Sequence, residues 1–251
     1  MRHQAVDSGN TAAPAASAIG QRIEAVAWDG VAAALDERGW ATTGPLLTSS
    51  ECAELTEAYG KAALFRSRVV MARHGFGRGE YQYFTYPLPD LVARLRQSLY
   101  PHLATVADRW NALLKADTKF PPQLDTYLAR CHAAGQARPT PLLLKYGADD
   151  FNCLHRDLYG PLVFPLQATI LLSEPARDFT GGEFLLVAQR PRAQSRAEVV
   201  PLTRGEAVIF AVHHRPARGA RGVYRVALRH GVSRIRAGNR YALGIIFHDA
   251  A

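Results

Sequence analysis

Cysteine is scarce in this sequence. Only Cys52, Cys131 and Cys153 occur in 251 residues, and no two of them form a Cys-x-x-Cys pair. Small secreted domains that depend on disulfides carry a denser, even-numbered set. The sequence therefore argues against a disulfide framework, and we expect a protein of the reducing cytoplasm.

Long hydrophobic runs are also missing. No stretch reaches the roughly eighteen apolar residues that a membrane-spanning helix needs, so no membrane partner is expected. The first twenty residues are rich in alanine, but Asp7, Asn10 and Pro14 interrupt any apolar core of a secretion signal. Residues 1–20 are expected to form a disordered tail, and residues 21–251 a single domain.

Acidic residues are outnumbered. The chain has 22 Asp and Glu against 30 Lys and Arg, a formal net charge of +8. From position 190 to position 240 there are twelve arginines, two acids and no lysine. Planar guanidinium groups suit phosphate, so this composition favours a polyanionic partner. The alternative is a basic surface that only keeps the protein dissolved.

The hydrophobic pattern divides the chain near residue 141. Apolar residues at spacings of three and four predict a helix from Ile23 to Arg38 and a helical stretch from Pro89 to about Lys115, which Pro101 should kink or divide. Short β-like runs follow, at residues 142–146, 162–172, 183–188, 199–202, 207–212, 224–230 and 240–247. We expect an α+β protein with a helical support and lid over 21–140 and a β-sandwich or jelly-roll core over 141–251.

The segment from Phe65 to Tyr86 mixes arginines with aromatic residues around three glycines. Its Gly-x-Gly-x-Gly run lacks the strand–turn–helix setting of a phosphate loop, so it does not indicate a nucleotide fold. Rings such as Tyr81 and Tyr83 could stack on bases while arginines meet phosphates. The alternative is a hairpin whose aromatic side chains fill a core.

His155 and Asp157 form a His-x-Asp pair at the spacing that lets two side chains of an extended segment face one way. A second histidine would complete a 2-His-1-carboxylate site, which leaves half of an octahedral Fe(II) open. The candidates are His213, His214, His230 and His248. His230 is favoured because it ends a predicted strand whose successor returns through Arg240.

Arg240 shares one strand face with Ala242, Gly244 and Ile246, while larger residues occupy the other face. An arginine among small residues on an interior face needs an anion as its partner. We therefore expect Arg240 to point into the barrel, with room beside it for a small ligand.

These residues together resemble the 2-oxoglutarate/Fe(II)-dependent dioxygenases. The surrounding blocks resemble a bacterial branch of nucleic-acid oxygenases, regarded as oxidative demethylases of damaged DNA. The blocks are Phe65-Arg66-Ser67-Arg68-Val69, Pro139-Thr140-Pro141-Leu142-Leu143-Leu144, Phe164-Pro165-Leu166-Gln167, Gly181-Gly182-Glu183-Phe184, Gln189-Arg190-Pro191-Arg192 and Arg229-His230-Gly231-Val232-Ser233. The resemblance extends from about Arg38 to the C-terminus.

The resemblance implies a double-stranded β-helix, cupin-like, with an N-terminal helical support. It implies that His155, Asp157 and His230 bind Fe(II), that Arg240 binds the distal carboxylate of 2-oxoglutarate, and that Tyr146 hydrogen-bonds this cosubstrate. Dioxygen is the other cosubstrate, and the expected products are succinate, carbon dioxide and, from an N-methyl group, formaldehyde.

The substrate stays open at this point. Single-stranded or damaged DNA or RNA is the leading expectation, with Arg190, Arg192, Arg215, Arg218 and Arg221 flanking the pocket mouth and facing the Phe65–Tyr86 segment. The ten-residue spacing from His230 to Arg240 resembles that of prolyl hydroxylases, so a protein or small-molecule hydroxylase is an alternative. A non-catalytic nucleic-acid-binding module and a zinc hydrolase are further alternatives, although neither requires a dicarboxylate clamp.

Overall fold

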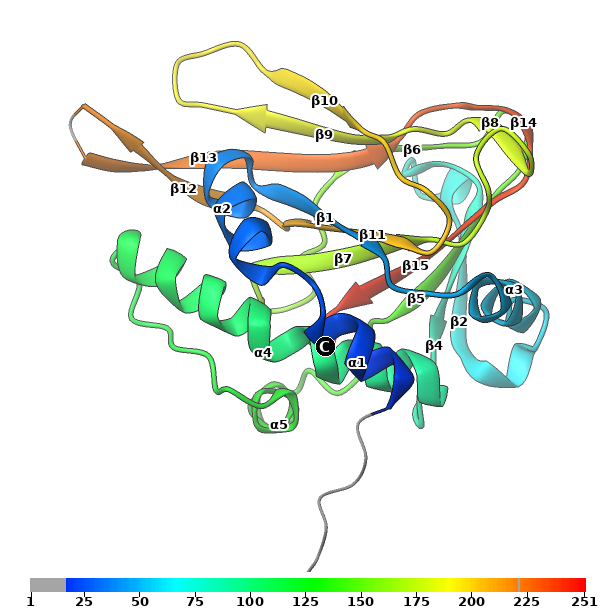
Figure 1. The fold of residues 1–251 in the computed structure, drawn as a ribbon, viewed down its shortest axis with the longest axis horizontal. Coiled ribbons are helices and arrows are strands. Elements are labelled where there is room, and N and C mark those ends of the chain that lie inside the picture. The colour runs from blue at the N-terminus through cyan, green and yellow to red at the C-terminus, as the bar shows by residue number, and fades with distance from the viewer. Residues whose placement is uncertain (1–16, 221) are drawn as a thin grey trace, which may run out of the picture.

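Two large antiparallel sheets lie face to face in the described part of the chain, with helices α1, α4 and α5 along the outer side of the larger sheet (Figure 1), and a third sheet has two strands. A computed structural model describes residues 17–220 and 222–251. The helices are α1 (Ala18–Glu24), α2 (Trp28–Arg38), α3 (Ser49–Ala58), α4 (Asp90–Leu113) and α5 (Leu124–Ala133), with short 3-10 turns η1 (Ala62–Leu64) and η2 (Met71–Arg73). The strands are β1 (Trp40–Pro45), β2 (Phe65–Val70), β3 (Gly77–Arg78), β4 (Glu80–Phe84), β5 (Leu142–Tyr146), β6 (Phe151–His155), β7 (Leu166–Leu171), β8 (Phe179–Gly181), β9 (Phe184–Gln189), β10 (Arg196–Val200), β11 (Glu206–Ala211), β12 (His214–Gly219), β13 (Gly222–Val232), β14 (Ile235–Gly238) and β15 (Arg240–Ile246).

The strand order is that of a double-stranded β-helix. Within the described ranges, the larger sheet runs β1-β11-β7-β15-β5-β4-β2, and the smaller runs β10-β9-β13-β6-β3 with β12 paired to β13. Successive strands β5, β6 and β7 alternate between the sheets, which winds the chain around a closed interior. The predicted α+β fold with a jelly-roll core is therefore confirmed.

The main core lies between the larger sheet and the helices. All six residues of β7 are buried, as a central strand covered on both faces requires. Helix α4 faces this sheet with an apolar stripe at Val92, Leu95, Leu99 and Leu103, each with no exposed surface. Burying such a side chain contributes roughly 1.5–3 kcal/mol, so α4 is held by packing and in turn shields the sheet from water.

A buried ion pair ties the end of the chain to α4. The side chains of Arg96 and Asp249 are 1% and 0% exposed, and their atoms Nη2 and Oδ1 lie 2.8 Å apart. Tyr86 Oη and His132 Nε2 each lie 2.8 Å from the second oxygen of the Asp249 carboxylate. Arg96 also donates from Nε to the carbonyl of Ile246, the last residue of β15. The network therefore anchors the strand that carries Arg240.

We predict that Arg96→Ala lowers the free energy of unfolding by about 3–5 kcal/mol, because it leaves the Asp249 carboxylate buried with its main positive partner removed. Chemical denaturation measures this loss. Arg94→Ala is the matched control: its partner Asp90 lies on the same helix in an exposed i,i+4 pair, so the loss should be about 0.3–0.5 kcal/mol. Equal losses in the two variants would contradict the proposed anchoring.

The prediction of one helix from Ile23 to Arg38 is wrong. Helix α1 ends at Glu24 and α2 begins at Trp28. The Trp28 indole N–H donates to the Ile23 carbonyl at 2.9 Å, and the Val26 backbone N–H donates to the same oxygen at 3.2 Å. These bonds use a carbonyl that a continuing helix would need, so the chain turns there.

Pro101 does not divide α4, which continues from Asp90 to Leu113. The proline is exposed, so its ring lies on the solvent side of the helix. The buried stripe continues past it to Val106 and Trp110. Packing of this stripe outweighs the roughly 3 kcal/mol that an interior proline costs.

The Phe65–Tyr86 segment forms sheet edges. Strands β2 and β4 extend the larger sheet beyond β5, and Phe65 stacks on the buried Phe84 with ring centroids 4.9 Å apart. Between them β3 crosses to the smaller sheet, where a Cβ at Gly77 (φ +126°) would lie 2.4 Å from the Phe151 carbonyl oxygen. Gly77 therefore permits the close contact between β3 and β6. The alternative that aromatic side chains of this segment fill a core holds for Phe65 and Phe84.

The two predicted parts of the chain are interleaved in space. Strands β1, β2, β3 and β4, all from the part expected to be mainly helical, join the two sheets of the β core. Most of the predicted tail at residues 1–20 lies outside the described residues, and α1 already begins at Ala18. None of the described helices combines the length and apolar content that a membrane crossing requires.

Candidate metal centre

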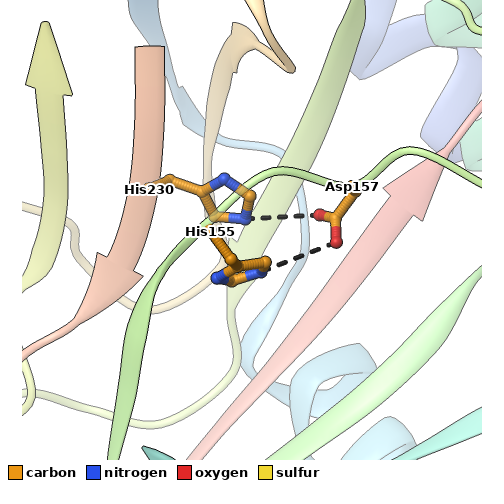
Figure 2. A group of neighbouring side chains, drawn as sticks. All are labelled: His155, Asp157 and His230. Carbon is orange, nitrogen blue, oxygen red and sulfur yellow. Dashed lines mark ion pairs between the residues drawn. The ribbon is translucent and has the colours of Figure 1, made fainter. Parts of the chain in front are cut away.

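Two histidines face each other across neighbouring strands. His155 ends β6, and the antiparallel register with β13 places His230 directly opposite it. Their ring centroids lie 4.2 Å apart. Asp157 follows in the segment that leaves β6, and its carboxylate points toward both rings (Figure 2). The structure thus brings together the three residues selected from the sequence.

The separations between these side chains suit one ion. Asp157 Oδ1 lies 3.5 Å from His155 Nε2, and Oδ2 lies 3.3 Å from His230 Nε2. Ligands at right angles, each about 2.1 Å from a shared ion, lie about 3 Å apart, so small adjustments would close the site. Two imidazoles and a carboxylate on one face are the donors typical of non-haem Fe(II) oxygenases. The residues present therefore fit Fe(II).

The other candidate histidines lie elsewhere. His248 is fully buried and its Nδ1 accepts a hydrogen bond from the Phe164 backbone N–H at 3.2 Å. His213 and His214 lie at the start of β12 with ring centroids 3.5 Å apart. None of these three histidines belongs to the one cluster of the described residues that could hold a metal ion.

Two further side chains hold the Asp157 carboxylate. The Tyr159 hydroxyl donates to Oδ1 and the Gln167 amide donates to Oδ2, each at 2.7 Å. Tyr159 in turn accepts a hydrogen bond from the Tyr83 hydroxyl at 3.0 Å. Charge-assisted hydrogen bonds of this kind fix the orientation of a ligating carboxylate.

Tyr159 and Gln167 are functional residues that the sequence patterns did not predict. Gln167 carried a usable signal, because it is an amide side chain in a central strand whose other residues, apart from Thr169, are apolar. A buried amide in such a strand needs a polar partner. Tyr159 gave no comparable signal, since it lies in the irregular segment after β6.

The cluster favours an ionised carboxylate. Burial alone would raise the pKa of Asp157, but hydrogen bonds from and charges on the two histidines outweigh it and hold this pKa well below its usual range. Burial and the neighbouring His155 lower the pKa of His230, which favours its neutral form. An ionised carboxylate and a neutral imidazole are the forms that bind metal.

A cavity of about 190 Å³ extends from this cluster into the barrel. Its lining includes Tyr146, Arg240 and Ala242, and Arg240 is only 2% exposed. The Arg240 guanidinium carbon lies 5.7 Å from the Tyr146 ring centroid and 5.8 Å from that of Phe179. Within the described residues the guanidinium has no carboxylate partner, and its Nε has no hydrogen bond. The predicted inward orientation of Arg240 is observed.

The room beside Arg240 is smaller than the sequence suggested. A Cβ at Gly244 would lie 2.6 Å from the Leu142 side chain, so Leu142 fills the space over this glycine. Clearance for a ligand therefore depends mainly on Ala242. Cavities of about 150 Å³ can hold a molecule as large as benzene, so the remaining volume is adequate for a small dicarboxylate.

Two of the residues predicted to contact nucleic acid are buried. Arg215 is 6% exposed, and its Nη1 donates to the backbone carbonyls of Asp36 and Pro216. Tyr83 is 8% exposed and is engaged with Tyr159. These two predictions are wrong, because both side chains lie on the inward faces of their strands. Tyr81 lines the cavity, and Arg221 lies outside the described residues.

The remaining predicted arginines are exposed but do not face the Phe65–Tyr86 segment. Arg190 and Arg192 lie in the loop between β9 and β10, and Arg218 lies near the tip of the β12–β13 hairpin. Figure 1 shows both tips at one end of the long axis and β2 and β4 toward the other. The predicted groove with an arginine side and an aromatic side opposite it is therefore wrong.

Residues 79–250 match the sequence model of a family described as an oxygenase catalysing oxidative methylation of damaged DNA. The chain belongs to this family. Two uncharacterized proteins from strains of Mycobacterium tuberculosis are each 55% identical to it over 168 residues, which is 67% of this chain and 72% of theirs.

Solved structures share the fold of this oxygenase. An oxidoreductase of the 2OG-Fe(II) oxygenase family from Burkholderia pseudomallei has a TM-score of 0.52 and 16% identity, covering 89% of this chain and 92% of that one. A prolyl 4-hydroxylase from Phytophthora capsici has a TM-score of 0.53 and 17% identity, covering 95% of this chain and 67% of that one. As a member of this oxygenase family the chain is an oxidoreductase, and its His155, Asp157 and His230 could hold a metal ion.

We predict that Tyr159→Phe weakens binding of Fe(II) by about tenfold, because it removes one of the two hydrogen bonds that orient the Asp157 carboxylate. Anaerobic titration with Fe(II), followed by calorimetry, measures the change. Tyr127→Phe is the control, since the buried Tyr127 hydroxyl has no hydrogen-bond partner among the described residues and removing it should leave the affinity unchanged. Unaltered affinity in Tyr159→Phe would show that Tyr159 does not support the ligand.

Proposed function

We propose that this oxygenase removes N-methyl groups oxidatively from bases of damaged DNA. In this proposal His155, Asp157 and His230 hold Fe(II), and Arg240 binds the distal carboxylate of 2-oxoglutarate with Tyr146 beside it. When bound, the iron and the 2-oxo acid supply dioxygen-dependent hydroxylation of a C–H bond, coupled to conversion of 2-oxoglutarate to succinate and carbon dioxide.

The buried charge of Arg240, which has no carboxylate partner among the described residues, carries the proposal. Burial lowers the pKa of a guanidinium, yet arginine stays protonated, so the charge remains inside the barrel. A buried ion without a partner costs several kcal/mol. A dicarboxylate that reaches from the metal cluster to Arg240 would supply that partner through a bidentate contact. A zinc hydrolase would have no use for such a clamp.

The chain's own groups would orient the reaction and keep water out. Tyr159 and Gln167 hold the Asp157 carboxylate, and the cavity walls between the triad and Arg240 are mostly apolar. Exclusion of water strengthens the ionic contacts within the site. A methyl group on nitrogen that gains a hydroxyl becomes a hydroxymethyl group, which then loses formaldehyde and leaves the N–H. The methyl group is removed, not added, by such chemistry.

Features of the pocket rim support a base as the substrate. Phe76 lines the cavity although it is 48% exposed, and Tyr81 lines it as well. Flat apolar side chains at a pocket entrance suit a base that has left its stack. The family description points to damaged DNA. Arg190, Arg192 and Arg218 are exposed and could meet the phosphate backbone.

We predict that Arg240→Ala raises the 2-oxoglutarate KM roughly 100-fold, the equivalent of about 3 kcal/mol for a lost charged hydrogen-bond pair. Binding of Fe(II) should change by less than about twofold, because among the described residues Asp157 forms ion pairs only with His155 and His230, not with Arg240. Succinate formation at varied 2-oxoglutarate measures the first effect and metal titration the second. Arg236→Ala removes an exposed arginine from β14 and is the control. An unchanged KM in Arg240→Ala would remove the clamp from the proposal.

The substrate is tested by measuring succinate and formaldehyde together across a panel. The panel contains N-methylated single-stranded DNA, the same sequence as RNA, unmethylated DNA and proline-containing peptides. We expect both products in equal amounts from methylated DNA only. Succinate without formaldehyde, formed with a hydroxylated peptide, would replace the proposal by a protein hydroxylase.

A further inference from the structure

A row of arginines lies on the outer face of the smaller sheet. In β13, Val226, Leu228 and His230 are buried and point inward, whereas Arg225 and Arg229 are exposed at alternating positions. The register pairs Arg218 of β12 with Val223, two residues before Arg225, so Arg218 shares this outer face. Arg225 and Arg229 are about 13 Å apart along the strand, from a rise of about 3.3 Å per residue.

Arg156 connects this row to the metal cluster. It lies between His155 and Asp157, and it lines the same cavity. Its Nε donates to the Leu228 carbonyl at 3.1 Å, which lays the side chain across β13. Burial lowers the pKa of Arg156, and the positive charge of Arg229 lowers it further, as expected for neighbouring guanidinium groups. The row of positive charge thus begins at the pocket and extends along β13.

Carboxylates are absent from the outward positions of the strands around this row, within the described residues. Those positions hold Leu185, Val187 and Gln189 on β9, Ala197 and Val199 on β10, and His214, Pro216 and Ala227 beside the arginines. Six other exposed arginines each pair with a carboxylate: Arg68, Arg78, Arg94, Arg177, Arg196 and Arg234. None of Arg156, Arg218, Arg225 and Arg229 has such a pair in the part of the chain that the structure describes.

We propose that Arg156, Arg229, Arg225 and Arg218 form a track for the phosphate backbone of single-stranded DNA, leading along β13 to the metal pocket. We call these four residues the β13 arginine track. The inference rests on the proposed function and adds where the strand lies. Like charges without internal partners attract a polyanion, and guanidinium groups bind phosphate bidentately. Bases of a strand on this track reach the exposed side chains of Leu154 and Leu158, which flank the His-x-Asp segment.

If the β13 arginine track binds DNA, the affinity for single-stranded DNA should fall with salt, and substitution of the track arginines should weaken this dependence. Each phosphate neutralised on a single strand contributes about 0.7 to the slope of log affinity against log salt. Arg225→Gln combined with Arg229→Gln should lower that slope by about 1.4 and weaken binding by tens of fold at 50 mM salt. Fluorescence anisotropy with a labelled twelve-nucleotide single strand measures both quantities on the full chain, without iron or turnover.

Three comparisons make the test selective. Arg234→Gln with Arg236→Gln removes the same charge from β14 and should change the slope by less than half as much. Arg225→Lys with Arg229→Lys keeps the charge and should retain most of the slope, which also shows that the site tolerates substitution. Polyglutamate of similar length should compete at least tenfold less well than DNA, since its carboxylates lack the phosphate spacing.

The outcomes separate the track from the proposed function. If the Gln pair on β13 binds DNA as the unchanged protein does, or polyglutamate competes equally, the β13 arginine track is overturned, even where methylated DNA is turned over. If the Gln pair alone loses the salt slope, the track stands, even where no N-methyl group is oxidised and the proposed function fails.

Discussion

The antiparallel pairing of β6 with β13 is the constraint on which the site depends. It places His230 opposite His155, and the segment that leaves β6 then brings Asp157 to both rings. A register shift of one residue would turn His230 to the outer face and bring Arg229 inward. Burial of Leu228 and Val226 on the inner face prevents that shift, so core packing and metal geometry require the same register.

Buried charge is handled differently at two places in the molecule. Arg96 is paired with Asp249, and this pair anchors the C-terminal segment to α4. Arg240 is buried to a similar extent and lines the cavity, but no carboxylate of the described residues pairs with its guanidinium. The ion pair of Arg96 with Asp249 needs no partner from outside the chain, so its role is structural. The charge of Arg240 requires an external anion, which is the physical reason for assigning Arg240 to a ligand.

Much of the site followed from short-range patterns in the sequence. These patterns depend on the two-residue period of a strand. They are the spacing of His155 and Asp157, the strand that ends near His230, and the small residues that share a strand face with Arg240. Tyr159, by contrast, reaches Asp157 from an irregular segment, and Gln167 reaches it from the opposite sheet. Such contacts depend on how the sheets are stacked, which no local pattern encodes.

Long-range packing also explains why the predicted arginine surface and the predicted single helix from Ile23 to Arg38 were wrong. The abundance of arginine was visible in composition, but which arginines face outward depended on strand register. Arg215 and Arg225 lie on neighbouring strands, yet one is buried against α2 and the other is exposed. At the break between α1 and α2, the Trp28 indole and the Val26 backbone N–H both donate to the Ile23 carbonyl. The apolar periodicity of that region does not reveal these bonds.

The most direct test is a crystal structure of the protein with Mn(II), a redox-inert substitute for Fe(II), and 2-oxoglutarate. The account predicts one ion bound by His155 Nε2, a carboxylate oxygen of Asp157 and His230 Nε2, at about 2.0–2.3 Å. It also predicts the distal carboxylate of 2-oxoglutarate within hydrogen-bonding distance of the Arg240 guanidinium. An ion bound elsewhere, or a 2-oxoglutarate that leaves Arg240 unpaired, would contradict it.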